Sequence, residues 1–267
     1  MAPIDTASAS SAPPSARSEP DGQSRPAGIG IPELRSARRA AGLFVTTARL
    51  IVEGRVELDA PGLAVRAQRT ARALLRVHGV DRRCSGPTPR PPAILVANHI
   101  SYLDPLVIAA VVPCIAIAKG EVRSWPLFGA GLRALGVVFV RRGDAHSGAV
   151  ALRRTWRALD RGAMVLNFPE GTTSDGHAVA PFRRGIFGLA AMAGVEVVPA
   201  HVSYDDDRVA WFGGQTLAPH YWELSRVASV RARVRFARPI AADASEDPRS
   251  VAARVREVVA GLHDCDD

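Results

Sequence analysis

The sequence has few cysteines, one lysine and no long apolar run, and these shortages exclude several classes of protein. Cys84, Cys114 and Cys265 are far apart and odd in number, and no Cys/His spacing typical of a zinc site occurs. We therefore expect no metal site, and the cysteine usage fits a reducing cytosolic setting. The longest apolar stretch, Leu106–Ala118, is interrupted by Pro113. It is too short for a membrane span, which needs about 18 apolar residues.

Two common catalytic motifs are also missing. No G-x-S-x-G elbow occurs, which counts against a serine hydrolase, and no G-x-x-x-x-G-K-[ST] loop occurs, which counts against a P-loop nucleotide enzyme. Gly129-Ala130-Gly131 with Ala134 imitates a dinucleotide fingerprint. No convincing strand precedes it, so we discard that interpretation.

The formal net charge is +8, and most of the excess lies in one segment. Residues 31–90 hold twelve Arg and five acids, whereas residues 1–30 hold two Arg and three acids. Such a basic segment favours an anionic partner, either a phospholipid surface or a nucleic acid. No aromatic stacking surface or nucleic-acid-binding motif accompanies the charge, so we expect a membrane surface and no nucleic acid. A basic binding protein without catalysis remains the alternative of another class.

The chain divides into three segments by composition. Residues 1–30 are rich in Ser, Ala, Pro and Gly and are predicted to be a disordered tail. Residues 31–83 are predicted to be helical and amphipathic, with the Arg residues of 63–77 on or beside the polar face. Such a helix either packs on the core or contacts a membrane, and the two are compatible. Residues 84–267 begin with a Pro-rich connector, residues 84–92, and are predicted to form the main globular domain.

Within that last segment, short apolar strands alternate with helices. This alternation predicts an α/β fold with a mixed, largely parallel central sheet flanked by helices. The predicted strands are Ala93–Ala97, Cys114–Ala118, Val137–Val140, Ala163–Phe168, Glu196–Ala200 and Val230–Phe236. The predicted helices are Tyr102–Val112, Ala145–Asp160, Phe182–Ala193 and Pro248–Leu262.

A histidine and an aspartate follow the first of these strands at close spacing. His99 lies in the loop after the strand, and Ser101 with Asp104 forms an S-x-x-D pair before an apolar run. Pro105 suits a first helical turn, because its missing N–H has no helical partner there. An aspartate bonded to one imidazole nitrogen lets the other nitrogen take a proton from a hydroxyl group. The pair is therefore a candidate general base and its orienting acid. Taken alone, this spacing is more often a helix-capping aspartate next to an unrelated loop histidine.

Two further clusters have the chemistry of an anion site. Gly136–Arg142 is a buried strand that ends in two adjacent arginines, whose guanidinium groups suit a phosphate. Asn167–Ser174 is a strand running into a Pro-Glu-Gly turn with three hydroxyls, whose N–H groups suit a phosphate or an oxyanion. Taken alone, the first is more typical of an exposed strand end with solvated charges, and the second is also compatible with an ordinary turn.

Together these clusters resemble the glycerolipid acyltransferase family. That family has the blocks N-H-x-x-x-x-D, G-x-x-F-x-x-R, F-P-E-G-T-x-S and V-P, and all four occur here in order between residues 98 and 200. The resemblance implies that His99 is the general base and Asp104 its partner. It implies that Arg142 binds the acceptor phosphate. It places Glu170, Gly171, Thr172 and Ser174 in the acceptor site, Arg183 and Arg184 as further anion contacts, and Pro199 in the fourth block.

The implied reaction moves a fatty acyl group from acyl-CoA or acyl carrier protein to the hydroxyl of 1-acylglycerol-3-phosphate, which yields phosphatidic acid. The resemblance implies no cofactor besides this acyl donor. A lyso-ornithine lipid or glycerol-3-phosphate is an alternative acceptor. Many bacterial relatives carry strongly apolar N-terminal helices, whereas this chain has the basic amphipathic segment. We therefore expect a peripheral protein on the cytoplasmic face of the membrane.

Overall fold

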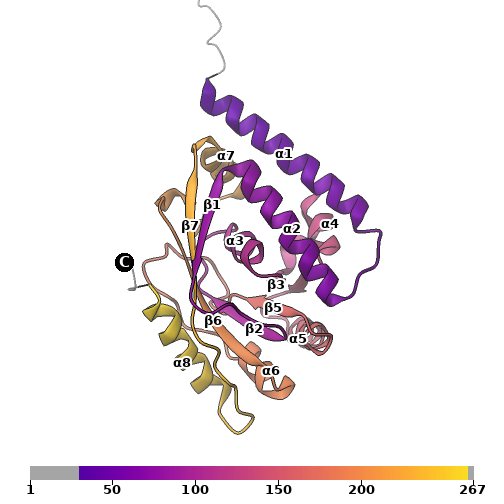
Figure 1. The fold of residues 1–267 in the computed structure, drawn as a ribbon, viewed down its shortest axis with the longest axis vertical. Coiled ribbons are helices and arrows are strands. Elements are labelled where there is room, and N and C mark those ends of the chain that lie inside the picture. Colours follow the sequence, from indigo (N-terminus) through magenta and orange to yellow (C-terminus); the bar gives the residue numbers. More distant parts are fainter. Residues whose placement is uncertain (1–29, 264–267) are drawn as a thin grey trace, which may run out of the picture.

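A computed structural model describes residues 30–263. The predicted disordered tail, apart from Gly30, and Cys265 lie outside the described residues. Within residues 30–263 the architecture is a seven-stranded sheet with helices on both faces (Figure 1).

The central sheet has the strand order β1-β7-β6-β2-β5-β3-β4. All neighbouring strands are parallel except β6 and β7, which are antiparallel. The predicted mixed, largely parallel α/β sheet is therefore confirmed. The strands are β1 Val80–Ser85, β2 Ala93–Ala97, β3 Ile115–Lys119, β4 Val138–Val140, β5 Met164–Asn167, β6 Glu196–Tyr204 and β7 Val230–Phe236.

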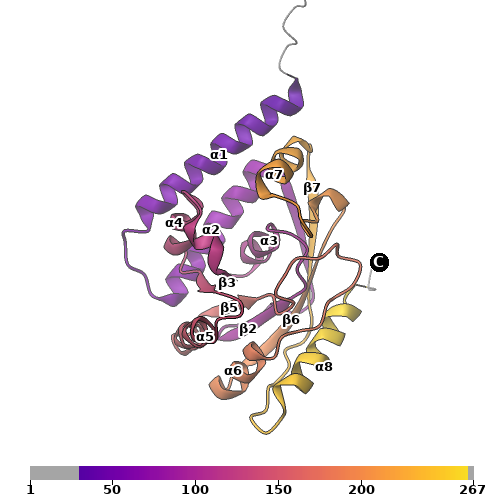
Figure 2. The same cartoon turned by 180° about the vertical axis from the view of Figure 1, so that it is seen from behind.

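The helices form two layers, seen from opposite sides in Figures 1 and 2. On one face α3 packs against the sheet and α2 covers α3, while α1 lies outside, against α2, α4 and α7. On the other face lie α5, α6 and α8. The helices are α1 Ile31–Glu53, α2 Ala60–His78, α3 Asp104–Val111, α4 Phe128–Ala134, α5 Ala145–Asp160, α6 Gly185–Ala193, α7 Leu217–Arg226 and α8 Pro248–Gly261, with short 3₁₀ turns η1 Gly120–Ser124 and η2 Asp207–Val209.

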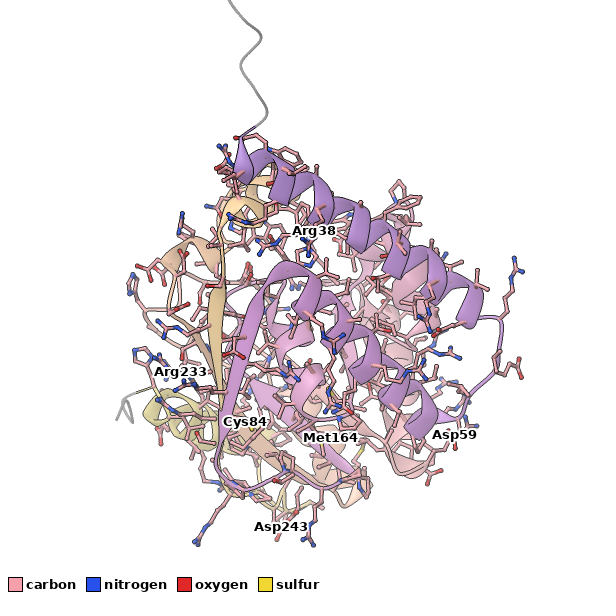
Figure 3. The ribbon with its side chains drawn as sticks, turned by 45° about the horizontal axis from the view of Figure 1, so that its top comes forward. Arg38, Asp59, Cys84, Met164, Arg233 and Asp243 are labelled. Carbon is pink, nitrogen blue, oxygen red and sulfur yellow. The ribbon has the colours of Figure 1, made fainter. Side chains whose placement is uncertain are left out.

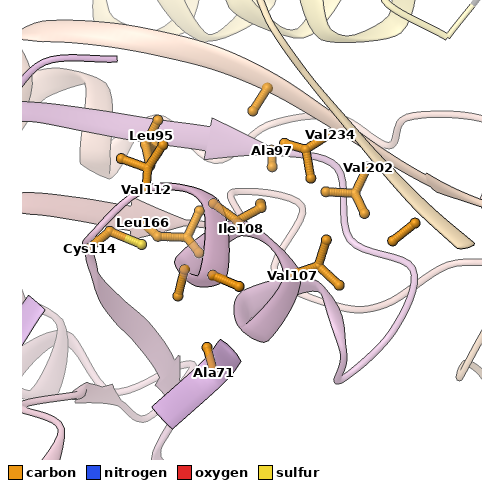
Figure 4. Packing of buried hydrophobic residues seen from close by; sticks show 14 of the residues in the cluster. Ala71, Leu95, Ala97, Val107, Ile108, Val112, Cys114, Leu166, Val202 and Val234 are labelled. Carbon is orange, nitrogen blue, oxygen red and sulfur yellow. The ribbon is translucent and has the colours of Figure 1, made fainter. Parts of the chain in front are cut away.

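Helix α3 lies in the middle of the larger hydrophobic cluster (Figure 4). Val107 and Ile108 are fully buried between the sheet and α2, against Leu95, Leu166 and Ala71. Burial of side chains of this size stabilises the fold by about 1.5–3 kcal/mol each. The loop that carries His99 is thus held between a buried strand and a buried helix.

Residues 80–83 were predicted to be helical, and this prediction is wrong. They belong to β1, which is an edge strand parallel to β7. Only Val80 of this strand is buried, so its polar sequence carries no apolar alternation. Gly79, at φ 67°, ends α2 in the left-handed conformation and lets the chain turn into the strand. The predicted boundary between residues 83 and 84 falls inside β1.

Helix α2 buries its apolar face on the core, and its arginines do not all face solvent. Arg66, predicted on or beside the polar face, is buried and donates to the carbonyls of Ala134 and Val56. Arg72 donates to Ala110 near the end of α3, and Arg39 of α1 donates to carbonyls at the end of α7. Cations satisfy the free carbonyls and the dipole at helix C-termini. Part of the basic excess therefore stabilises helix ends.

Helix α1 presents several large apolar side chains outward, whereas Val65 is the exposed large apolar side chain of α2. Arg38 on this helix and Asp59 before α2 are labelled in Figure 3. Exposed fractions on α1 and just beyond it are 60–75% for Ile31, Leu34, Phe44, Val45, Val52 and Val56. Over residues 30–263, no helix combines the length and the apolar character that crossing a membrane requires.

Candidate functional site

The structure brings His99 and Asp104 into direct contact. His99 follows β2, and Asp104 is the first residue of α3, as the sequence predicts. The distance from His99 Nδ1 to Asp104 Oδ2 is 2.7 Å. Because the carboxylate accepts, Nδ1 carries the proton and Nε2 is the ring's free acceptor. The His99 ring lines a cavity, so this acceptor is available to a bound hydroxyl.

Asp104 is fully buried and is held by four donors. Besides His99, its Oδ2 accepts the N–H groups of Ile100 at 2.7 Å and Ser101 at 2.9 Å. Its Oδ1 accepts the Tyr204 hydroxyl at 2.7 Å. Burial first, and then the negative Asp104, raises the pKa of Tyr204 well above its usual value, so the hydroxyl keeps its proton and donates. The helix dipole at the start of α3 also favours a negative charge there.

Glu170 and Ser174 hold the backbone of His99 from both sides. The Glu170 Oε1 atom accepts the His99 N–H at 2.7 Å, and its Oε2 accepts the Ala180 N–H at 2.9 Å. The Ser174 N–H donates to the His99 carbonyl at 2.9 Å. Burial raises the pKa of Glu170, although the two N–H donors oppose that shift. Both carboxylate oxygens thus have backbone partners, and the predicted contact of Glu170 with the acceptor stays a prediction.

We expect Glu170→Gln to lower both stability and turnover. The amide nitrogen of glutamine would face a backbone N–H, leaving a buried donor unpaired at a cost of about 1–3 kcal/mol. Thermal unfolding and steady-state kinetics measure the two effects, and kcat should fall more than the acceptor KM rises. Glu257→Gln, on the exposed face of α8, is the matched control, with an expected change within about 0.5 kcal/mol. A rise in acceptor KM at unchanged kcat would contradict this positioning role.

Three residues that support the site were not identified from the sequence. Phe168 stacks on the His99 ring with centroids 4.1 Å apart and an interplanar angle of 17°. The Asn98 side chain bonds both the N–H and the carbonyl of Val202, which joins the loop after β2 to β6. Tyr204 is the third. Asn98 and Phe168 begin motif blocks, which is a signal, but Tyr204 stands in a strand without a motif.

Arg142 and Arg183 form the positive side of the site. Burial, and then the charge of Arg183, lowers the pKa of Arg142, whereas Glu121 opposes the shift. Gly171, at φ 78°, lets the chain pass beside Arg183, because a Cβ there would lie 2.8 Å from Arg183 Nε. The lack of a side chain at position 171 therefore leaves room for the Arg183 guanidinium group, whose charge acts on Arg142. Within residues 30–263, neither guanidinium group makes an ion pair.

One large cavity joins these groups. Its volume is about 1370 Å³, and His99, Arg142, Gly171, Thr172 and Arg183 all line it. Much of the remaining wall is apolar and comes from α1, α2, α3 and α4. Of the other predicted site residues, Asp104, Glu170 and Ser174 stand behind His99, while Arg184 and Pro199 do not line the cavity.

Comparisons with known proteins agree with this arrangement. A family model described as Acyltransferase matches residues 75–203. A lyso-ornithine lipid O-acyltransferase of Pseudomonas aeruginosa is 36% identical over 59% of this chain and 63% of that protein. The protein of the same description from Rhizobium meliloti is 32% identical over 69% of each chain. A 1-acyl-sn-glycerol-3-phosphate acyltransferase of Neisseria meningitidis is 30% identical over 70% of this chain and 76% of that protein.

A solved structure shares the fold. The crystal structure of the 1-acyl-sn-glycerophosphate (LPA) acyltransferase PlsC from Thermotoga maritima matches with a TM-score of 0.62. The match covers 88% of this chain and 97% of that chain, at 21% sequence identity. The likeness confirms the predicted fold class.

Proposed function

Because the chain belongs to the glycerolipid acyltransferase family, we propose that it transfers a fatty acyl group from a thioester to the hydroxyl of 1-acylglycerol-3-phosphate. The observation that carries this proposal is the His99–Asp104 pair beside two arginines without ion-pair partners, on one cavity. The arginines suit a phosphate, and the apolar walls suit an acyl chain.

The transfer is direct, with no acyl-enzyme intermediate. His99 Nε2 takes the proton of the acceptor hydroxyl as its oxygen bonds to the thioester carbonyl carbon. The imidazolium is stabilised by Asp104, and loop N–H groups near Gly171 stabilise the oxyanion. The carbon–sulfur bond then breaks, and the leaving thiolate takes the proton from the imidazolium. Both acyl-CoA and acyl carrier protein can supply such a thioester.

A lyso-ornithine lipid is the second candidate acceptor, because relatives of that description match the chain. The convergence of Arg142 and Arg183 favours a phosphate-bearing acceptor. The deciding experiment incubates the purified protein with labelled acyl-CoA and 1-acylglycerol-3-phosphate, lyso-ornithine lipid or glycerol-3-phosphate. Labelled phosphatidic acid as the main product supports the proposal. Product from lyso-ornithine lipid alone would reject it in favour of the second candidate.

Arg142→Ala should weaken binding of the acceptor more than binding of the donor. Loss of a charge-assisted contact costs about 1.5–3 kcal/mol, which corresponds to at least a tenfold rise in the acceptor KM. The donor KM should change much less, and two-substrate kinetics separates the two constants. Arg153→Ala is the control, because Arg153 is exposed on α5 and does not line the cavity. An equal rise in both KM values would argue against a phosphate contact.

Attachment to the membrane is proposed to occur through α1, at the cytoplasmic surface. Leu34, Val45 and Val52 project from its exposed side, with Arg38 and Arg49 exposed beside them. A helix of this kind lies in the interface plane, with its apolar side in the lipid and its arginines at the headgroups. The large cavity includes residues of α1 in its wall, so a lysolipid in the membrane would be close to it.

A further inference from the structure

A second concave site, a five-arginine cleft, lies away from His99. Its walls include Arg123, Arg133, Arg154, Arg157 and Arg161, and its volume is about 300 Å³. The last three come from the C-terminal half of α5 and just beyond it, and the first two come from η1 and α4. Arg133 Nη1 donates to the Arg123 carbonyl at 3.0 Å, which ties η1 to α4.

The charge of this cleft is not balanced by the protein. No carboxylate lines it, and among residues 30–263 no ion pair includes any of the five guanidinium groups. Exposed arginines elsewhere do have partners, such as Arg208 with Asp206 and Arg254 with Glu246. Like charges that converge in a cleft attract and concentrate anions. The five-arginine cleft therefore gathers five arginines without ion-pair partners at one concave site, which suits an anionic ligand.

Apolar side chains next to the cleft indicate which kind of anion fits it. Leu58 lines the cleft and is 40% exposed. A few residues earlier in the chain, Val52 near the end of α1 and Val56 just beyond it are 60–61% exposed. Asp59 accepts the Gly62 N–H at the start of α2 and, among residues 30–263, makes no ion pair with these arginines. A nucleotide phosphate would leave the valines and Leu58 in water. An anionic amphiphile would cover them.

From this juxtaposition we infer that the five-arginine cleft binds the phosphate headgroup of an anionic phospholipid, whose acyl chains lie along the exposed apolar end of α1. The inference rests on the proposed membrane attachment and not on the proposed chemistry. The cleft and the catalytic cavity both include Val137 in their walls, so they are neighbours on the same molecule. Headgroup binding there would fix the orientation of the enzyme on the bilayer.

The test compares two charge-matched double variants. Arg154→Gln with Arg157→Gln alters the cleft, while Arg153→Gln with Arg249→Gln removes two exposed arginines that do not line it. Co-sedimentation is measured with phosphatidylcholine vesicles that contain or lack phosphatidylglycerol. Two basic residues at an anionic surface strengthen binding by roughly tenfold or more, so the cleft variant should lose about that factor in partitioning to the anionic vesicles. The control should lose less than about threefold.

Each other outcome has a definite meaning. Equal losses in the two variants, or no loss in the cleft variant, would overturn the inference, because general charge would then explain the binding. Displacement of the wild type from vesicles by free CoA would assign the cleft to the donor nucleotide and would also overturn it. If the wild type does not bind anionic vesicles, both the proposed membrane attachment and this inference are rejected. Turnover of short-chain, water-soluble substrates tests the chemistry separately.

Discussion

Replacement of His99 by glutamine is expected to lower kcat by about 10²–10⁴-fold while the protein stays folded, because general base catalysis contributes about that much. Glutamine can still bond Asp104, but it cannot accept a proton from the acceptor hydroxyl. The ring is partly exposed to the cavity, with 19% of the side chain accessible, so its loss leaves no large buried void. Single-turnover measurements with a labelled acyl thioester give the rate of the chemical step.

The control for this change is His177→Gln. His177 is exposed and does not line the cavity, so its replacement should leave kcat and thermal unfolding unchanged. Retention of wild-type turnover by His99→Gln, with a normal unfolding temperature, would exclude His99 as the base. If His99→Gln unfolds at a lower temperature than the wild type, the same measurements are made on His99→Asn, whose side chain occupies less space beside Phe168.

The elements around His99 were predictable because their signals are local. An apolar strand, a polar loop and a Pro-initiated apolar helix follow one another within residues 93–112, and all appear where expected. The His99–Asp104 contact needs only five residues of chain, so sequence spacing is close to three-dimensional spacing there. The turn at Gly171 is also predictable, since glycine is favoured in a tight turn after a strand.

The missed features depend on contacts between segments far apart in the chain. Edge strand β1 is recognised by its pairing with β7, since its own sequence buries only Val80. Tyr204 reaches Asp104 because β6 continues beyond Ala200 while it pairs with β7, although the predicted strand stopped at Ala200. The role of Arg66 depends on where α4 ends. The periodicity of a single segment carries no information about contacts with such distant segments.

The third motif block illustrates a subtler limit. Its sequence suggests groups that contact a substrate, and the structure shows that Glu170 and Ser174 bond the backbone of His99. A carboxylate has several acceptor sites, so contact with backbone N–H groups and with a substrate is compatible in principle. Motif residue types thus predict that a residue belongs to the site, while the direction of its hydrogen bonds needs coordinates.

The second large effect is expected for Asp104→Asn. In the Ser-His-Asp triad the same change of the orienting aspartate lowers kcat by about 10⁴-fold, because the imidazole loses its orienting charge and tautomer. Here we expect a loss of about 10²–10⁴-fold with little change in either KM, since Asp104 does not line the cavity. An amide oxygen in the Oδ2 position can still accept the N–H groups of Ile100 and Ser101 and that of His99 Nδ1, which favours a folded variant. The expected loss here therefore comes from the missing negative charge that stabilises the imidazolium.

Tyr204→Phe separates orientation from charge in this network. It removes one hydrogen bond to the carboxylate, worth about 1.5–3 kcal/mol of unfolding free energy, but it keeps the negative charge beside His99. Its kcat should therefore fall far less than that of Asp104→Asn, even if the two variants unfold at similar temperatures. Measured together, unfolding and kcat distinguish a catalytic carboxylate from one that only caps α3. If kcat falls in both variants in proportion to their loss of stability, the capping role is favoured and Asp104 is removed from the proposed mechanism.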